Sequence, residues 1–112
     1  MKKLVVGDIH GGHRALIQVI ERVGPKNEDQ FIFVGDYVDG WSENVETIRF
    51  LVDFSKTHDC IFLRGNHDEL CYNYLKHSDA PSLWLQHGGT ASKASYDAIP
   101  KQEWLLRHPP CH

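Results

Sequence analysis

Three short apolar runs in the first half of the chain predict β-strands. They occupy residues 4–6, 31–34 and 60–63, and they are rich in Val, Ile, Leu and Phe. Each run is continuous rather than alternating, which is typical of strands covered on both faces of a parallel sheet. The pattern therefore predicts three parallel, buried strands.

Two helical patterns separate these runs. Residues 14–23 place apolar side chains on one face at helical spacing, and Gly24 follows as a stop signal. Residues 43–56 repeat the pattern, with Ser42 or Asn44 as the candidate N-cap. The order strand, helix, strand, helix, strand predicts an α/β fold built from two right-handed βαβ crossovers.

The second half of the chain carries shorter and more interrupted patterns. No linker or domain boundary divides it from the first half, so residues 1–112 are expected to form a single domain. The expected elements are helices over 69–76 and 90–96, a loop over 79–82, a further helix with Pro100 in its first turn, and an irregular tail over 107–112.

The composition excludes several classes of protein. The chain has 112 residues, a formal net charge of −3, 41% hydrophobic and 24% charged residues, which fits one ordinary globular domain. No apolar run approaches the ~20 residues of a membrane span, and the absence of Lys/Arg runs argues against a duplex nucleic acid partner. The cysteines show no C-x-x-C pair, which argues against a disulfide framework or a zinc ribbon and favours a cytoplasmic location.

Polar groups that can bind metal follow each predicted strand directly. The three segments are Gly7-Asp8-Ile9-His10-Gly11, Gly35-Asp36-Tyr37-Val38-Asp39-Gly40 and Gly65-Asn66-His67-Asp68. Because ligands bind beyond the carboxyl ends of parallel strands, we expect these segments to converge. An extended exit from the first strand would also point Asp8 and His10 to the same side. Carboxylate, imidazole and amide donors without thiolate favour Mn²⁺, Fe or Zn²⁺.

The alternative for any one of these segments is a turn followed by a helix cap. Three such segments in consecutive βα units favour a site over three unrelated turns. The strings GDIHG, GDYVDG and RGNHDE resemble the N-terminal signatures of the calcineurin-like metallophosphoesterases. They are most similar to the phosphoprotein phosphatase branch, whose pattern is GDxHG, GDxVDRG and GNHE, and the resemblance covers at least residues 4–75.

A weaker resemblance extends over residues 84–96, which are similar to a segment of bacterial members written WL..GG..T..SY. Together these similarities imply that residues 1–112 are the N-terminal part of one calcineurin-like domain. That part would be the parallel βαβαβ half of a four-layer sandwich, truncated here.

The resemblance implies a dinuclear metal site. Asp8 and His10 would hold the first metal ion. Asp36 would bridge both ions, and Asn66 would bind the second. The ions would be two divalent cations, Mn²⁺ first and Fe or Zn²⁺ as alternatives, and the hydroxide that they share would attack phosphorus in line.

The resemblance also implies a proton donor. His67 would protonate the leaving oxygen, and Asp39 would hold its imidazole charged and oriented. On its own, Asp39 in a glycine-rich loop could equally form an Asx-turn.

Two features depart from the family pattern. Gly40 stands where the family has an arginine that binds the substrate phosphate, so one bidentate contact is missing. Arg64 could substitute, although a structural ion pair is the commoner role for such a residue. Trp41 could line the pocket or stack on a base, although a packing aromatic at a helix entrance is the commoner case.

The second departure concerns the last two histidine ligands of the family, which lie in strings like VHAG and GHT. Neither string occurs here. Four of the remaining histidines are interpreted as surface residues, namely His77, His87, His108 and His112. We therefore expect the missing ligands to belong to sequence outside this chain.

Three hypotheses for the function follow. The first is a metal-dependent phosphoesterase that hydrolyses a phosphomonoester, with a serine/threonine phosphoprotein as the first substrate and a small phosphate ester as another. The second is a dinucleoside polyphosphate or other nucleotide hydrolase, which the segment at 84–96 supports. The third is a non-catalytic metal-binding fragment, which follows from the missing histidines. Such a half-sandwich would leave apolar sheet surface uncovered.

Overall fold

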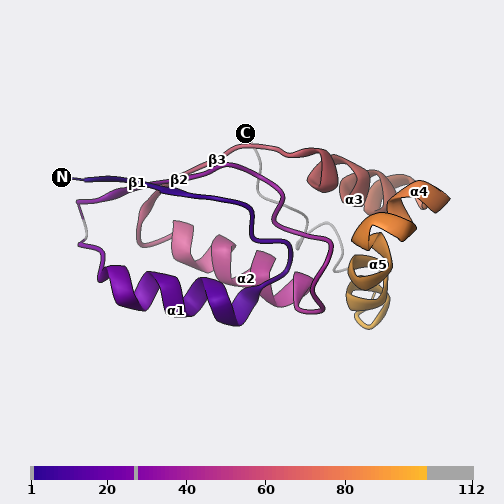
Figure 1. The fold of residues 1–112 in the computed structure, drawn as a ribbon, viewed down its shortest axis with the longest axis horizontal. Coiled ribbons are helices and arrows are strands. Elements are labelled where there is room, and N and C mark those ends of the chain that lie inside the picture. Colours follow the sequence, from indigo (N-terminus) through magenta and orange to yellow (C-terminus); the bar gives the residue numbers. More distant parts are fainter. Residues whose placement is uncertain (1, 27, 101–112) are drawn as a thin grey trace.

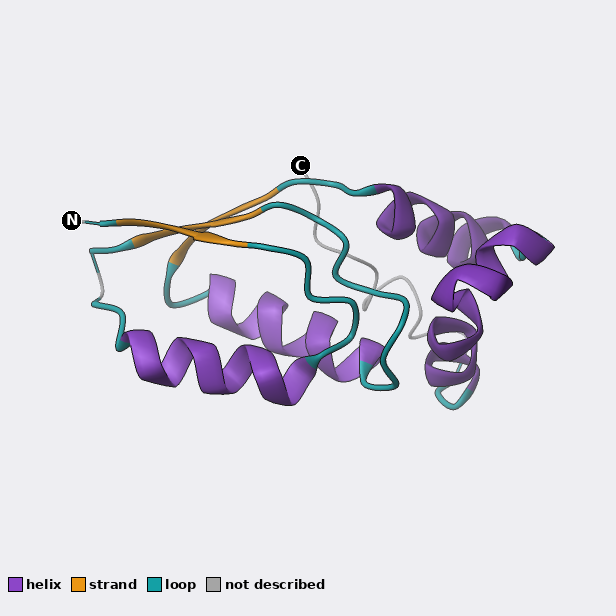
Figure 2. Cartoon of the chain, in the orientation of Figure 1, coloured by secondary structure: helices purple, strands orange, loops and turns teal. Residues whose placement is uncertain are grey.

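The computed structural model describes residues 2–26 and 28–100 (Figures 1 and 2). Three strands alternate with helices, and between the last strand and residue 100 the regular elements are all helices. In chain order the elements are β1 (Lys3–Val6), α1 (His13–Val23), β2 (Gln30–Phe33), α2 (Asn44–Ser55), β3 (Asp59–Phe62), α3 (Asn66–His77), α4 (Ser82–Trp84), η1 (Leu85–Gly89) and α5 (Thr90–Asp97). The three strands and the first two helices confirm the predicted elements, with small differences at their ends.

The strands form one parallel sheet in the order β1-β2-β3. Val6 pairs with Phe33, and Phe33 pairs with Phe62, so the last residues of the three strands lie side by side. The loops that follow the strands therefore leave the sheet at one edge. The fold class is α/β, as the sequence predicts.

Helices α1 and α2 lie on the same face of the sheet (Figure 1). Phe33 of β2 and Leu51 of α2 are fully buried between these layers. On the opposite face, the described residues leave a row of apolar side chains that pair across the sheet, Val5, Ile32 and Ile61. Val5 is 68% exposed. The prediction that the strands are covered on both faces is therefore wrong for the described residues, whereas the open apolar face expected of a half-sandwich is present.

The predicted end of α1 is confirmed, whereas the predicted N-cap of α2 is wrong. Gly24 ends α1 in a left-handed conformation with φ +58°, and its amide donates to the carbonyl of Ile20. Neither Ser42 nor Asn44 caps α2, which has Glu43 at its N-cap position and no side-chain capping bond. The Asn44 side chain is buried and is used elsewhere, because its Oδ1 accepts from the amide of Asp39 at 2.9 Å. A tertiary contact has replaced the predicted local one.

The helices after β3 lie beyond the carboxyl ends of the strands (Figure 2). Helix α3 begins at Asn66, earlier than the predicted start at residue 69. The predicted loop over 79–82 ends sooner, because α4 begins at Ser82, and α5 confirms the helix predicted over 90–96. The helix expected after Pro100 and the irregular tail over 107–112 fall outside the described residues.

Within the two described ranges, no helix is both long enough and apolar enough to cross a membrane.

Candidate metal and active site

The loops after β1 and β2 are held against each other by backbone hydrogen bonds. The amides of Ile9 and His10 both donate to the carbonyl oxygen of Asp36, at 3.1 and 2.9 Å. The amide of Gly11 donates to the carbonyl oxygen of Tyr37 at 2.8 Å. Because β1 and β2 are adjacent parallel strands, these bonds keep the two loops together beyond the sheet.

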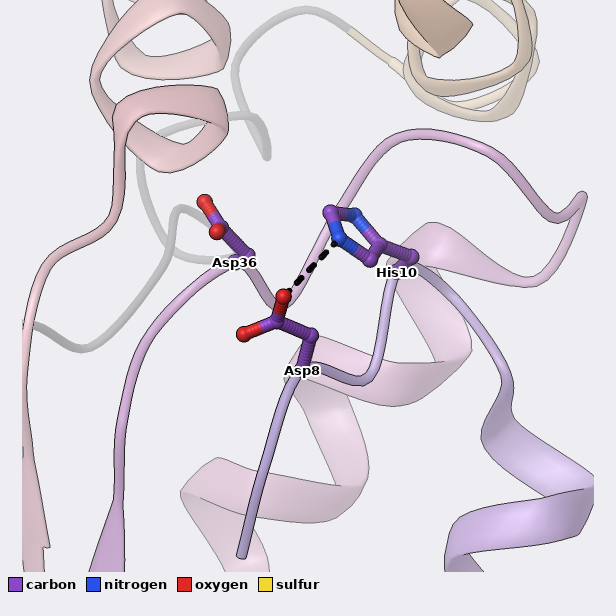
Figure 3. Close-up of side chains that lie close together, drawn as sticks. All are labelled: Asp8, His10 and Asp36. Carbon is purple, nitrogen blue, oxygen red and sulfur yellow. Dashed lines mark ion pairs between the residues drawn. The ribbon is translucent and has the colours of Figure 1, made fainter.

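Asp8, His10 and Asp36 form a cluster at this point (Figure 3), with one donor atom of each residue within 4.8 Å of the others. Nε2 of His10 lies 3.6 Å from Oδ2 of Asp8. Nδ1 of His10 lies 3.0 Å from the carbonyl oxygen of Val38. A carbonyl can only accept, so Nδ1 carries a proton and, in the neutral imidazole, Nε2 is the nitrogen with the free lone pair. A metal-binding imidazole usually donates its other N–H to a backbone carbonyl, as Nδ1 of His10 does here. The donor atoms of Asp8, His10 and Asp36 therefore fit a divalent cation.

The site residues adopt left-handed backbone conformations. The angle φ is +49° at His10, +55° at Asp36 and +72° at Asp39. Among the non-glycine residues of 2–26 and 28–100, only Ser78 shares this feature. Asp and His tolerate the left-handed region better than most residues, at a cost of ~1 kcal/mol or more each. The chain therefore turns at His10 and does not stay extended through this residue, although Asp8 and His10 do point to the same side as predicted.

A second pair of predicted site residues lies beside the cluster. Nδ1 of His67 donates to Oδ2 of Asp39 at 2.9 Å, and Asp39 is fully buried. The His67 ring meets the His10 ring edge-on, with 5.0 Å between centroids and an interplanar angle of 87°. Because the Asp39 carboxylate bonds to an imidazole from a distant element, the Asx-turn alternative does not describe its role.

Asn66 is the exposed first residue of α3. The next amide, that of His67, donates to Oδ1 of Asp36 at 3.1 Å, which ties the start of the helix to the cluster. Gly65 permits this approach, because a Cβ atom there would overlap the Asp36 carboxylate. The backbone therefore brings Asn66 to the edge of the site, and its role as a ligand stays a prediction.

Asp68 braces the site in a way that sequence reasoning missed. Its carboxylate accepts hydrogen bonds from the amides of Asp36 at 2.6 Å, Tyr37 at 2.8 Å and Gly65 at 2.9 Å. Burial raises the pKa of the Asp68 carboxyl, and these three backbone bonds oppose the shift. An acidic residue three positions after the helix cap was a possible signal of the bond to Gly65. The two bonds to the β2 loop have no sequence signal.

Asp68→Ala should lower the free energy of unfolding by about 3 kcal/mol, because it leaves buried backbone amides without an acceptor. Chemical denaturation followed by circular dichroism measures this loss. Glu69→Gln is the matched control, since Glu69 is the exposed next residue of the same helix. Equal loss in both variants would contradict the bracing role.

The first departure from the family pattern, Gly40, fits the local backbone. Gly40 has φ +106°, a conformation that a side chain rarely adopts, and its Cβ would meet Cβ of His10 at 3.4 Å. The neighbouring Trp41 is 71% exposed and lines an open pocket of about 510 Å³ together with Arg14 and Glu43. Packing at a helix entrance is therefore wrong for Trp41.

The other candidates of the sequence are not part of the cluster of Asp8, His10 and Asp36. The Arg64 guanidinium stands 5.3 Å from the centroid of the Tyr72 ring, and the ion pairs of the described ranges do not include it. The ion-pair interpretation of Arg64 is thus wrong there. His77 and His87 are exposed, as expected of surface residues. His108 and His112 lie outside the described residues.

Two further residues were missed because they touch the site only through tertiary contacts. Trp84 and Ser92 both donate hydrogen bonds to the carboxylate of Asp39. The available signal was the WL..GG segment, in which Trp84 comes shortly before the paired Gly88 and Gly89.

The sequence of the chain matches a known protein family. The profile of the calcineurin-like phosphoesterases matches residues 1–109. Over 67 residues the chain is 37% identical to serine/threonine-protein phosphatase PP1-delta of Caenorhabditis elegans. This alignment covers 58% of this chain and 22% of that protein.

Solved structures give the same fold. A protein assigned as a diadenosine tetraphosphatase matches with a TM-score of 0.63 at 24% identity, covering 96% of this chain and 42% of that one. A protein serine/threonine phosphatase of Saccharomyces cerevisiae, similar to human phosphatase PP5, matches with a TM-score of 0.60 at 19% identity, covering 95% and 30%. The chain thus spans less than half the length of each of these relatives.

Proposed function

This chain belongs to the calcineurin-like phosphoesterase family, and we propose that it serves the metal-dependent hydrolysis of a phosphomonoester, with a serine/threonine phosphoprotein as the substrate class. The cluster of Asp8, His10 and Asp36 carries this proposal, because its donor atoms lie within 4.8 Å of one another. The His67 ring stands beside it, 5.0 Å from that of His10. A cation site next to an imidazole proton donor suits phosphate ester hydrolysis, because the cation can stabilise charge on the phosphoryl oxygens and the imidazole can protonate the leaving group.

Four residues would hold two divalent cations, with Mn²⁺ as the first candidate. Asp8 and His10 would bind one cation, Asp36 would bridge the two, and Asn66 would bind the other. When bound, such cations would neutralise charge on the phosphoryl oxygens and supply a water of lowered pKa as the nucleophile. A carboxylate oxygen of Asp36 lies within 4.8 Å of the donor atoms of Asp8 and His10, and Oδ1 of Asp36 also accepts the His67 amide.

His67 would supply the proton to the leaving oxygen. Its Nδ1 proton is committed to Asp39 at 2.9 Å, so Nε2 is the nitrogen that would face the substrate. Asp39 would orient the imidazole, because its fully buried carboxylate accepts a hydrogen bond from Nδ1 of His67. This residue pair fixes both the tautomer and the orientation of the donor.

The protein phosphatase substrate is supported by the 37% identity to PP1-delta over 67 residues. A nucleotide hydrolase is the second candidate, and Trp41 is the observation that favours it. Its indole is 71% exposed and lines the pocket of about 510 Å³ that opens beside the β1 loop. An exposed aromatic ring in this position offers a stacking surface for a base.

A substrate panel with purified chain and Mn²⁺ tests the proposal. Hydrolysis of p-nitrophenyl phosphate and of a phosphoserine or phosphothreonine peptide should appear with Mn²⁺, vanish with a chelator and return when the metal is restored. Turnover of a dinucleoside tetraphosphate alone would favour the nucleotide hydrolase. Binding of Mn²⁺ by calorimetry without any hydrolysis would instead support a non-catalytic metal-binding chain.

A further inference from the structure

We propose that Trp84 and Ser92 are positioning residues that fix the Asp39 carboxylate for His67, an inference that rests on the proposed role of His67. The Trp84 indole, the Ser92 hydroxyl and the Asp39 carboxylate are all buried. Trp84 is 1% exposed, and Ser92 and Asp39 are 0% exposed. Trp84 and Ser92 come from the helices after β3, whereas Asp39 comes from the loop after β2. The network therefore joins two parts of the chain at the site.

Each oxygen of the carboxylate has its own donor. Nε1 of Trp84 donates to Oδ2 of Asp39 at 2.7 Å, and His67 donates to the same oxygen at 2.9 Å. The hydroxyl of Ser92 donates to the other oxygen, Oδ1, in a short hydrogen bond. Ser92 Oγ also accepts from the Asp39 amide at 2.9 Å. Ser92 is thus hydrogen-bonded to both the side chain and the backbone of Asp39.

The pattern of donors has a consequence for orientation. An indole N–H can only donate, so Trp84 requires an acceptor oxygen at Oδ2. With Oδ1 held by Ser92, the carboxylate cannot rotate about its Cβ–Cγ bond without breaking a buried hydrogen bond. Oδ2 therefore stays directed at His67. The Asp39 amide is further fixed by Oδ1 of Asn44 at 2.9 Å.

The paired glycines explain how both donors reach one carboxylate. Gly88 has φ +102°, and a Cβ atom there would lie 2.7 Å from the amide nitrogen of Gly40. The Gly40 amide in turn donates to the carbonyl of Gly88 at 3.2 Å. Gly89 packs directly on the Trp84 ring, where a Cβ atom would overlap the indole. The kink between α4 and α5 thus lets the backbone touch the Asp39 loop while Trp84 and Ser92 flank it.

Trp84→Phe and Ser92→Ala remove the two donors and keep most of the packing. The control for Ser92 is Ser95→Ala on the same helix, since Ser95 Oγ accepts from the amide of Val45 at 3.1 Å. The control for Trp84 is Tyr74→Phe, a neighbouring ring at 5.5 Å whose phenol donates to Asp97. Thermal melting of all four variants shows which of them fold.

The first readout is the Nδ1 proton of His67, observed by NMR in chain labelled with ¹⁵N-histidine. In the unsubstituted chain this proton should exchange slowly with water. Trp84→Phe and Ser92→Ala should each speed the exchange by about tenfold, the factor expected for one lost hydrogen bond. The two controls should leave it unchanged. A merely structural role would not single out this one proton.

The second readout is the dependence of kcat on the leaving group. Both test variants should lower kcat more for phenyl phosphate than for 2,4-dinitrophenyl phosphate, with KM unchanged. Exchange rates like those of the controls, or no bonded His67 proton in the unsubstituted chain, would overturn the inference. If the exchange effect is present and no chain hydrolyses any substrate, the proposed function fails while the positioning of His67 stands.

Discussion

Asp36→Asn should lower the affinity of the chain for Mn²⁺ by at least about 100-fold, because even the loss of a partner outside the ligand set costs ~10–100-fold. Asp36 is the residue that both proposed cations share. Asparagine tolerates the left-handed backbone at φ +55°. Its side-chain carbonyl can also keep the 3.1 Å bond from the His67 amide. The substitution therefore removes charge and leaves the fold, and calorimetric titration measures the result.

The matched control is Asp53→Asn, which removes an exposed carboxylate of α2 that lies 3.5 Å from Lys56. This control should bind Mn²⁺ as the unsubstituted chain does. Any hydrolysis that depends on the metal should be lost in Asp36→Asn and kept in Asp53→Asn. Unchanged affinity in Asp36→Asn would remove this residue from the proposed ligand set.

His67→Asn should lower kcat by about 10²–10⁴-fold for phenyl phosphate, the range typical of general acid catalysis. It should change kcat little for 2,4-dinitrophenyl phosphate, whose leaving group departs without a proton. The reason is the geometry of the pair, in which Asp39 occupies Nδ1 at 2.9 Å and leaves Nε2 to act on the substrate. Initial rates across a series of aryl phosphates give the dependence directly.

His77→Asn is the control for this substitution, because His77 is exposed at the other end of the same helix. It should leave every rate unchanged. A uniform loss across the aryl phosphates in His67→Asn would contradict proton donation and point instead to a role in binding the phosphate. Circular dichroism of both variants shows whether α3 is retained.

The sequence predicts the regular elements well because local patterns determine them. The apolar runs locate the strands, and Gly24 marks the end of α1 by its left-handed conformation. The start of α3 was missed, since Asn66 and the residues after it are fixed by the cluster and by Asp68 rather than by helical periodicity. Continuous apolar runs also predicted strands covered on both faces. A run of this kind reports how apolar a strand is, and it cannot report which elements cover it.

The site was predictable only in part for a similar reason. Strand order alone brings Asp8, His10 and Asp36 to one edge of the sheet, so their convergence follows from the fold class. The bond between Trp84 and Asp39 joins residues 45 positions apart in the chain, and it depends on the close approach of a kinked helix pair to the β2 loop. The spacing of apolar and polar residues along the sequence does not predict such contacts.

The left-handed conformations at His10, Asp36 and Asp39 have a consequence for engineering the chain. Alanine at any of these positions would strain the backbone as well as remove the side chain, so a loss of metal affinity could not be separated from a loss of stability. Glycine would relieve the strain, but at Asp39 it would leave the buried donors of Trp84 and Ser92 without their acceptor. Asparagine tolerates the left-handed region and is therefore the substitution that best separates the two effects.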